Sequence, residues 1–159
     1  MLRYESAGRI GVSGIRKILT ETGSIDRRWW RGVLGFDAEG LDRPAVLSGA
    51  TPLFHAQGIP DEIDLFMAFS DAAFIVGRLS DWSKRFTIKW HLTMNGDDWG
   101  AIDASGLSPS LRGQMKKWAR RAGVASGGKG AWRVPEERRA AWLLQYKGER
   151  EGPASLQHS

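Results

Sequence analysis

The chain has 159 residues, of which 42% are hydrophobic and 26% charged, a balance typical of one soluble globular domain. It contains no cysteine, which excludes disulfides and thiolate metal sites. No apolar run is long enough to span a membrane and the first residues lack the apolar core of a signal peptide, so we expect a cytoplasmic protein without a membrane partner.

The positive charge is concentrated in the last third of the chain. Residues 1–100 hold 12 Lys and Arg against 13 Asp and Glu, a net charge of −1, whereas residues 101–159 hold 11 against 5, a net charge of +6. The eight tryptophans are also many for a chain of this length. Such charge asymmetry favours an anionic partner for one region of the protein.

Residues 1–60 are predicted to form an irregular N-terminal extension. The segment 13–23 has the capping residues and spacing of a short helix, and a second short helix is expected over 26–31. Three glycines and three prolines interrupt residues 36–60, which favours loop with one strand near 45–47.

The segment 62–69 is predicted to be the first strand of a central unit. Every odd-numbered position from Ile63 to Phe69 is apolar, which is the period of a half-buried strand. Ser70 has the chemistry of an N-cap, and apolar residues then recur at helical spacing as far as Phe86. We therefore expect a helix to follow this strand.

The clearest local signal is a hairpin. Residues 86–94 alternate apolar and polar side chains without a break, and Asn95-Gly96, which suits a type I′ turn, follows them. With these two residues as the loop, three cross-strand pairs are expected. They are Met94 with Asp97, Leu92 with Trp99, and Trp90 with Ala101.

A second helix is predicted over 108–122. Ser108 is its expected N-cap, Pro109 occupies its first position, and Gly123 ends it. A glycine-rich link over 127–130 and a short strand over 131–134 complete the unit.

The order strand, helix, strand, strand, helix, strand over about residues 62–134 is the ferredoxin-like βαββαβ arrangement. We therefore predict an α+β fold in which two helices cover one face of a four-stranded antiparallel sheet. A single domain is expected over 1–148, with a C-terminal helix over 135–147 and a mobile tail over 149–159.

No catalytic motif is evident, and a non-enzymatic function is favoured. The segment from Gly123 to Gly130 fits seven positions of a phosphate-binding loop, but Gly130 stands where Ser or Thr must hold Mg²⁺. We interpret the segment as a flexible connection. His91 and the three aspartates that follow it scatter over both faces of the predicted hairpin, so neither a metal nor a cofactor is predicted.

The basic region 112–139 carries the strongest functional signal. Its first five cations fall mainly on the solvent side of the predicted 108–122 helix, opposite an apolar stripe that includes Trp118. Lys and Arg neutralise phosphates, and an exposed aromatic ring can stack on a base. The alternative interpretation is a solvated helix face beside a buried Trp132. The predicted nucleic-acid-binding residues are Arg112, Lys116, Lys117, Arg120, Arg121, Lys129, Trp132, Arg133, Arg138 and Arg139.

A second cluster at 27–31 combines arginine and tryptophan, the residues that dominate interface energetics. It is either a short helix with one buried and one half-exposed tryptophan or an anchor for a partner protein. The leading hypothesis is a small non-enzymatic nucleic-acid-binding protein. The alternative is an interaction module, of inhibitor or immunity type, for an acidic protein partner. Its candidate interface residues are Arg27, Arg28, Trp29, Trp30 and Arg31.

Overall fold

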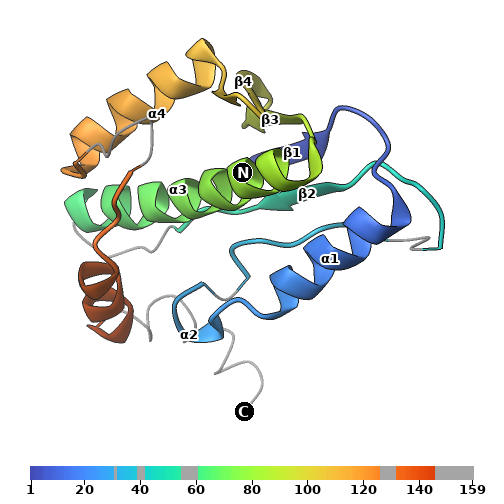
Figure 1. The fold of residues 1–159 in the computed structure, drawn as a ribbon. Coiled ribbons are helices and arrows are strands. Elements are labelled where there is room, and N and C mark those ends of the chain that lie inside the picture. The colour runs from blue at the N-terminus through green and yellow to red at the C-terminus, as the bar shows by residue number, and fades with distance from the viewer. Residues whose placement is uncertain (31, 39–41, 55–60, 126–131, 146–159) are drawn as a thin grey trace.

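A computed structural model describes residues 1–30, 32–38, 42–54, 61–125 and 132–145 (Figure 1). It is a mixed α+β fold, which confirms the predicted class. Residues 136–145 form a further helix near the C-terminus. The named elements in chain order are β1 (Leu2–Ser6), α1 (Val12–Gly23), α2 (Arg27–Trp30), β2 (Ser48–Thr51), α3 (Asp61–Phe86), β3 (Trp90–Met94), β4 (Asp97–Asp103), β5 (Gly106–Leu107) and α4 (Pro109–Ala122).

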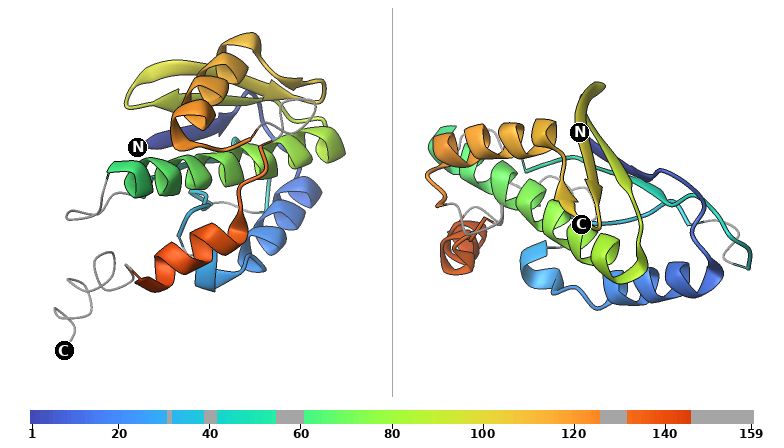
Figure 2. Two further views of the ribbon diagram at one scale, coloured as in Figure 1. Left: turned by 90° about the vertical axis from the view of Figure 1, so that its left-hand side faces the viewer. Right: turned by 45° about the horizontal axis from the view of Figure 1, so that its top comes forward.

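The described strands form one antiparallel sheet in the order β2-β1-β3-β4-β5. Leu2, Tyr4 and Ser6 of β1 are buried, whereas the alternating Arg3 and Glu5 are exposed. The same alternation continues on β3. One face of the sheet therefore packs on the helices and the other faces solvent, as the views in Figures 1 and 2 show.

The predicted strand at 62–69 is wrong, because these residues belong to the helix α3. Buried positions in α3 recur at helical spacing from Phe66 to Ser83, so the alternation from Ile63 to Phe69 overlapped the start of a longer helical pattern. Ser70 is an interior helical residue whose hydroxyl donates to the carbonyl oxygen of Met67 at 2.8 Å. It does not cap the helix.

The ferredoxin-like strand order is not confirmed. The sheet takes β1 and β2 from residues 1–60, which were predicted to be an irregular extension, and β1 pairs with both β2 and β3. Of the predicted strand at 131–134, Trp132 occupies only an isolated bridge and residues 133–134 are not in a strand. Residue 131 lies outside the described residues, as do the glycine-rich link and the predicted tail over 149–159.

The predicted hairpin turn is confirmed, but its register is only partly correct. Asn95 and Gly96 both have positive φ angles, 51° and 89°, and Met94 pairs with Asp97. An irregularity then places Leu92 opposite Gly100 and Trp90 opposite Ile102. Trp99 is the additional residue of this bulge, which explains why the predicted pairs of Leu92 and Trp90 were wrong by one position.

The core lies between the sheet and the helices. Phe36 packs against Tyr4 of β1, Trp82 of α3 and Trp90 of β3, with ring centroids 5.6 to 5.8 Å apart. Tyr4 also donates a hydrogen bond to the carbonyl oxygen of Gly35 at 2.7 Å. Within the described residues, no helix has both the length and the apolar character needed to cross a bilayer.

Candidate functional site

The helix α4 is fixed at both ends by local chemistry that the sequence predicted. The hydroxyl oxygen of Ser108 accepts hydrogen bonds from the backbone N–H groups of Leu111 and Ala101, at 3.4 and 3.0 Å. Gly123 has a φ of 69° and ends the helix in the left-handed conformation. These two ends hold the basic face of α4 in a defined position beside β4.

Five cations of α4 are exposed, and no acidic residue occurs in this helix. The helical period places them in two rows, because residues four positions apart lie one above the other. An outer row and an inner row result. The outer row comprises Arg112, Lys116 and Arg120, and the inner row comprises Lys117 and Arg121.

Within the described residues, these five side chains make no ion pair or side-chain hydrogen bond. The arginines of α3 differ, since Arg78 and Arg85 are both paired with Glu21. The described side chains therefore do not neutralise the positive charge of α4, which remains available to an anion.

The inner row lines a groove of about 610 Å³ between α4, the tip of the β3–β4 hairpin, the start of α3 and the segment after β2. The bulge in β4 places Trp99 in this groove, and Lys117, Trp118 and Arg121 enter it from α4. Other lining residues are Met1, Pro52, Leu53, Phe54, Asp64, Ala68, Met94, Asn95 and Gln114.

Two tryptophans form a corner in the groove. The ring centroids of Trp99 and Trp118 lie 5.8 Å apart at an interplanar angle of 85°, and the Trp118 ring also packs on Phe69 at 5.6 Å and 73°. Both tryptophans are half-buried. The sequence assigned Trp118 to an apolar stripe, and this assignment missed that the ring also contributes to a groove.

Gly100 allows α4 to pack this closely on β4. Its φ is 117°, and a Cβ at this position would overlap the Ser108 hydroxyl oxygen and lie 3.0 Å from the backbone nitrogen of Leu111. Glycine is the residue that adopts this conformation without strain. The groove thus depends on a bulge and a glycine.

Arg139 is in the predicted nucleic-acid-binding set, but its side chain is only 1% exposed. Its guanidinium lies 2.6 Å from Asp71 Oδ1 and donates to the backbone carbonyl of Trp29 at 2.8 and 3.0 Å. It also donates to Ser70 and lies 4.1 Å from the centre of the Trp30 ring. Arg139 therefore joins the C-terminal helix to α2 and α3 and is not presented to a phosphate.

The other predicted residues after α4 are not gathered on one face. Trp132 is half-buried against Phe69, and its buried indole nitrogen has no hydrogen-bond partner among the described residues. Arg138 is half-buried above the rings of Phe66 and Trp142, at 4.2 and 4.3 Å. Arg133 is exposed. Lys129 lies outside the described residues.

The cluster at 27–31 folds into the short helix α2. Trp30 is buried and stacks on Phe74 at 4.2 Å, whereas Trp29 is half-buried. Arg28 pairs with Asp26 at 3.2 Å, and Arg27 is exposed. Arg31 lies outside the described residues. The arrangement matches a short helix with one buried tryptophan.

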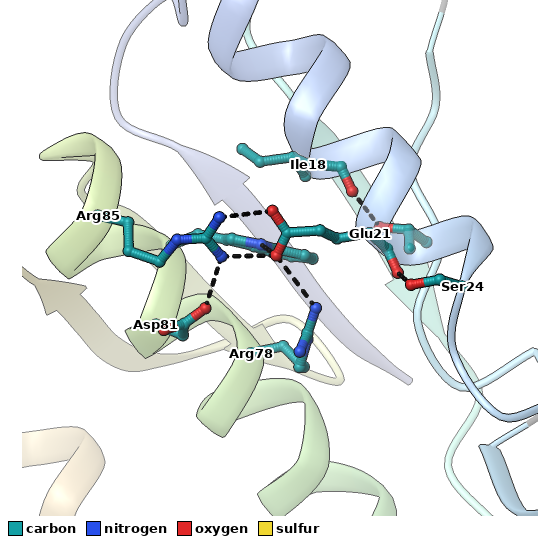
Figure 3. Close-up of polar contacts among 8 residues, drawn as sticks. Ile18, Glu21, Ser24, Arg78, Asp81 and Arg85 are labelled. Atoms are coloured by element: carbon teal, nitrogen blue, oxygen red, sulfur yellow. Dashed lines mark hydrogen bonds and ion pairs between the residues drawn. The ribbon is translucent and has the colours of Figure 1, made fainter.

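A network of charges joins α1 to the end of α3, as Figure 3 shows. Arg85 donates to both carboxylate oxygens of Glu21, at 2.6 and 2.7 Å, and to Asp81 at 2.9 Å. Hydrogen bonds from Arg85, and a weaker contribution from Trp82, lower the pKa of Glu21 to about 2. The carboxylate stays ionised and holds the two helices together, so this network is structural.

No group of three or more His, Cys, Asp or Glu residues converges on a metal-sized position in the described part of the chain. A comparison with protein-family models, curated proteins and solved structures finds no match for this chain. The functional proposal therefore depends on the chemistry of α4 and its groove.

Proposed function

We propose that this chain is a small non-enzymatic nucleic-acid-binding protein that contacts backbone phosphates through the basic face of α4. The observation that supports this proposal is the set of five exposed cations on one helix, none of which has a counter-charge among the described residues. Arg and Lys in such an array bind a polyanion by releasing its condensed counterions. Arg133 is exposed on the segment after α4 and is a further candidate contact.

The alternative, an interaction module anchored by α2, has weaker support. Trp30 is buried in the core, and Arg28 is already paired with Asp26. Of the two tryptophans, only the half-buried Trp29 offers part of its ring to a partner. Hot-spot anchors at interfaces are usually accessible aromatic or arginine side chains, so this surface is the less suitable one.

The test is a titration of labelled single-stranded and duplex oligonucleotides at ~50 and ~200 mM salt. With five phosphate contacts, log Kobs should fall against log salt with a slope of about −3.5 for single strands and about −4.5 for duplexes. These slopes correspond to losses of affinity of roughly 130-fold and 500-fold over that range. Absence of binding at the lower salt concentration would refute the proposal.

A charge-reversal pair locates the surface. Lys116→Glu with Arg120→Glu removes two contacts of the outer row, so the single-strand slope should fall to about −2.1. The matched control is Arg9→Glu with Arg43→Glu, which changes the net charge equally at two exposed positions away from α4. If both pairs weaken binding equally, α4 is not the contact surface.

A further inference from the structure

The groove beside α4 combines features that the outer row of cations lacks. Its walls are largely apolar and include the tryptophan corner and Met94. Its charged lining residues are Lys117, Arg121 and Asp64, and neither cation has a counter-ion within the part of the chain that the structure describes. A ligand that fits this groove has a flat apolar part and an adjacent negative charge. The inference drawn from this complementarity specifies the ligand of the proposed function and rests on that proposal.

The tryptophan corner suits a planar ring. The rings of Trp99 and Trp118 meet at 85°, so a ligand in the corner between them can contact the face of one ring and the edge of the other. Both rings are partly accessible. A base stacked on an indole face gains dispersion and excludes water, and such stacking tolerates any base because every base has a π-face. Gln114 adds a side-chain amide that both donates and accepts hydrogen bonds at the groove.

We infer that the groove binds an unpaired nucleobase of a single-stranded nucleic acid, with a neighbouring phosphate held by Lys117 and Arg121. A base in a duplex is stacked on both faces and cannot enter the groove without leaving the helix, which costs energy. The inference therefore predicts that the protein prefers single strands to duplexes, in addition to the salt-sensitive contacts of the outer row.

The first experiment compares three probes of equal length, about 12 nucleotides: oligothymidylate, an abasic deoxyribose-phosphate strand and a duplex. All three carry the phosphates, but only the first offers unpaired bases. We expect oligothymidylate to bind roughly 5- to 150-fold more tightly than the abasic strand. Salt-sensitive binding of equal strength to both strands would overturn the groove inference and leave the proposed function intact. No binding of any probe would refute the proposed function itself.

The second experiment uses variants of the corner. Trp99→Ala should remove most of the preference for oligothymidylate over the abasic strand, and Trp99→Phe should restore part of it because a smaller ring still stacks. The control is Trp29→Ala, which truncates another half-buried tryptophan on α2. An equal loss of preference in the control would contradict a role for the groove.

A measurement on the wild-type protein keeps the inference testable even where Trp99→Ala fails to fold. The indole N–H signals in a ¹⁵N-labelled sample should shift for Trp99 and Trp118 when oligothymidylate is added, and those of the buried Trp82 and Trp90 should stay in place. A third arm adds a short acidic peptide of alternating Glu and Leu. If this peptide shifts the two signals at lower concentration than the oligonucleotide, the groove is a protein site and the inference is wrong.

Discussion

The buried pair formed by Arg139 and Asp71 permits a sharp test of how the C-terminal helix is held. The two side chains are 1% and 0% exposed and lie 2.6 Å apart. Arg139→Met keeps the aliphatic packing but removes the guanidinium. The Asp71 carboxylate then stays buried and keeps the hydrogen bond from the backbone N–H of Phe54, at 2.7 Å. The backbone carbonyls of Trp29 and Met67 also lose the donor that Arg139 supplies.

The magnitude follows from what is left behind. Removing one partner of a buried ion pair typically costs about 3–5 kcal/mol, because the other charge stays desolvated and uncompensated. We expect Arg139→Met to lower the free energy of unfolding by this amount, a large share of the ~5–15 kcal/mol of a typical domain. The double variant with Asp71→Asn removes the stranded charge and keeps an acceptor for Phe54, so it should recover about 2 kcal/mol.

Urea denaturation followed by far-ultraviolet circular dichroism and tryptophan fluorescence measures these differences. Arg133→Met on the same segment is the control, since Arg133 is exposed and its replacement should change the free energy of unfolding by less than about 0.5 kcal/mol. The buried pair would be refuted if Arg139→Met lowered the free energy of unfolding by less than about 1 kcal/mol. It would also be refuted if the change in the double variant equalled the sum of the two single changes.

Two further predictions concern the support of α4 and of α1. Gly100→Ala should destabilise the protein by about 1–3 kcal/mol, because the φ of 117° is strained for alanine and the new Cβ meets Ser108. The control is Gly113→Ala inside α4, where nothing lies within 4 Å of the added Cβ, and it should stabilise the protein by up to about 1 kcal/mol. Thermal unfolding measures both variants, and equal changes in their melting temperatures would contradict this account. For Glu21, hydrogen bonds from Arg85 depress the folded-state pKa to about 2 from 4.5, so the stabilisation is complete above pH 4.5 and is lost as the pH falls towards 2. The difference in unfolding free energy between wild type and Glu21→Gln should therefore shrink over that range, and a constant difference would show that the ion pair with Arg85 does not form.

Turn and cap chemistry was predictable because it acts over a few residues. Asn95-Gly96 and the ends of α4 at Ser108 and Gly123 were correct, since each depends on a φ angle or a side chain that caps its own neighbourhood. The pattern of residues 62–69 alone did not reveal that this segment is the start of the helix α3. Its buried Ser70 donates to the Met67 carbonyl and accepts from Arg139, which is 69 positions away and therefore invisible to a local pattern.

The candidate site was predictable in part. The exposed cations of α4 follow from helical periodicity, which a single segment displays. The groove requires the bulge at Trp99 to bring a strand residue against a helix residue, Trp118, and the same bulge shifted the predicted register. Burial of Arg139 was likewise invisible, because a cation in a basic run gives no sign that an aspartate lies beneath it.

The clustered positive charges of α4 destabilise this helix, and the helix dipole offsets that cost only near the C-terminal end. Like charges four residues apart on a helix repel by about 0.2–0.5 kcal/mol per pair, and the outer row contains two such pairs. Arg120 and Arg121 gain from the negative end of the helix, but Arg112 lies in the first turns, near its positive end. In α3, by contrast, Arg85 lies four residues after Asp81 and pairs with it. No described side chain pairs with the cations of α4, and a polyanion along this helix would supply the counter-charge. This contrast is why we propose binding for α4 and support of the fold for the arginines of α3.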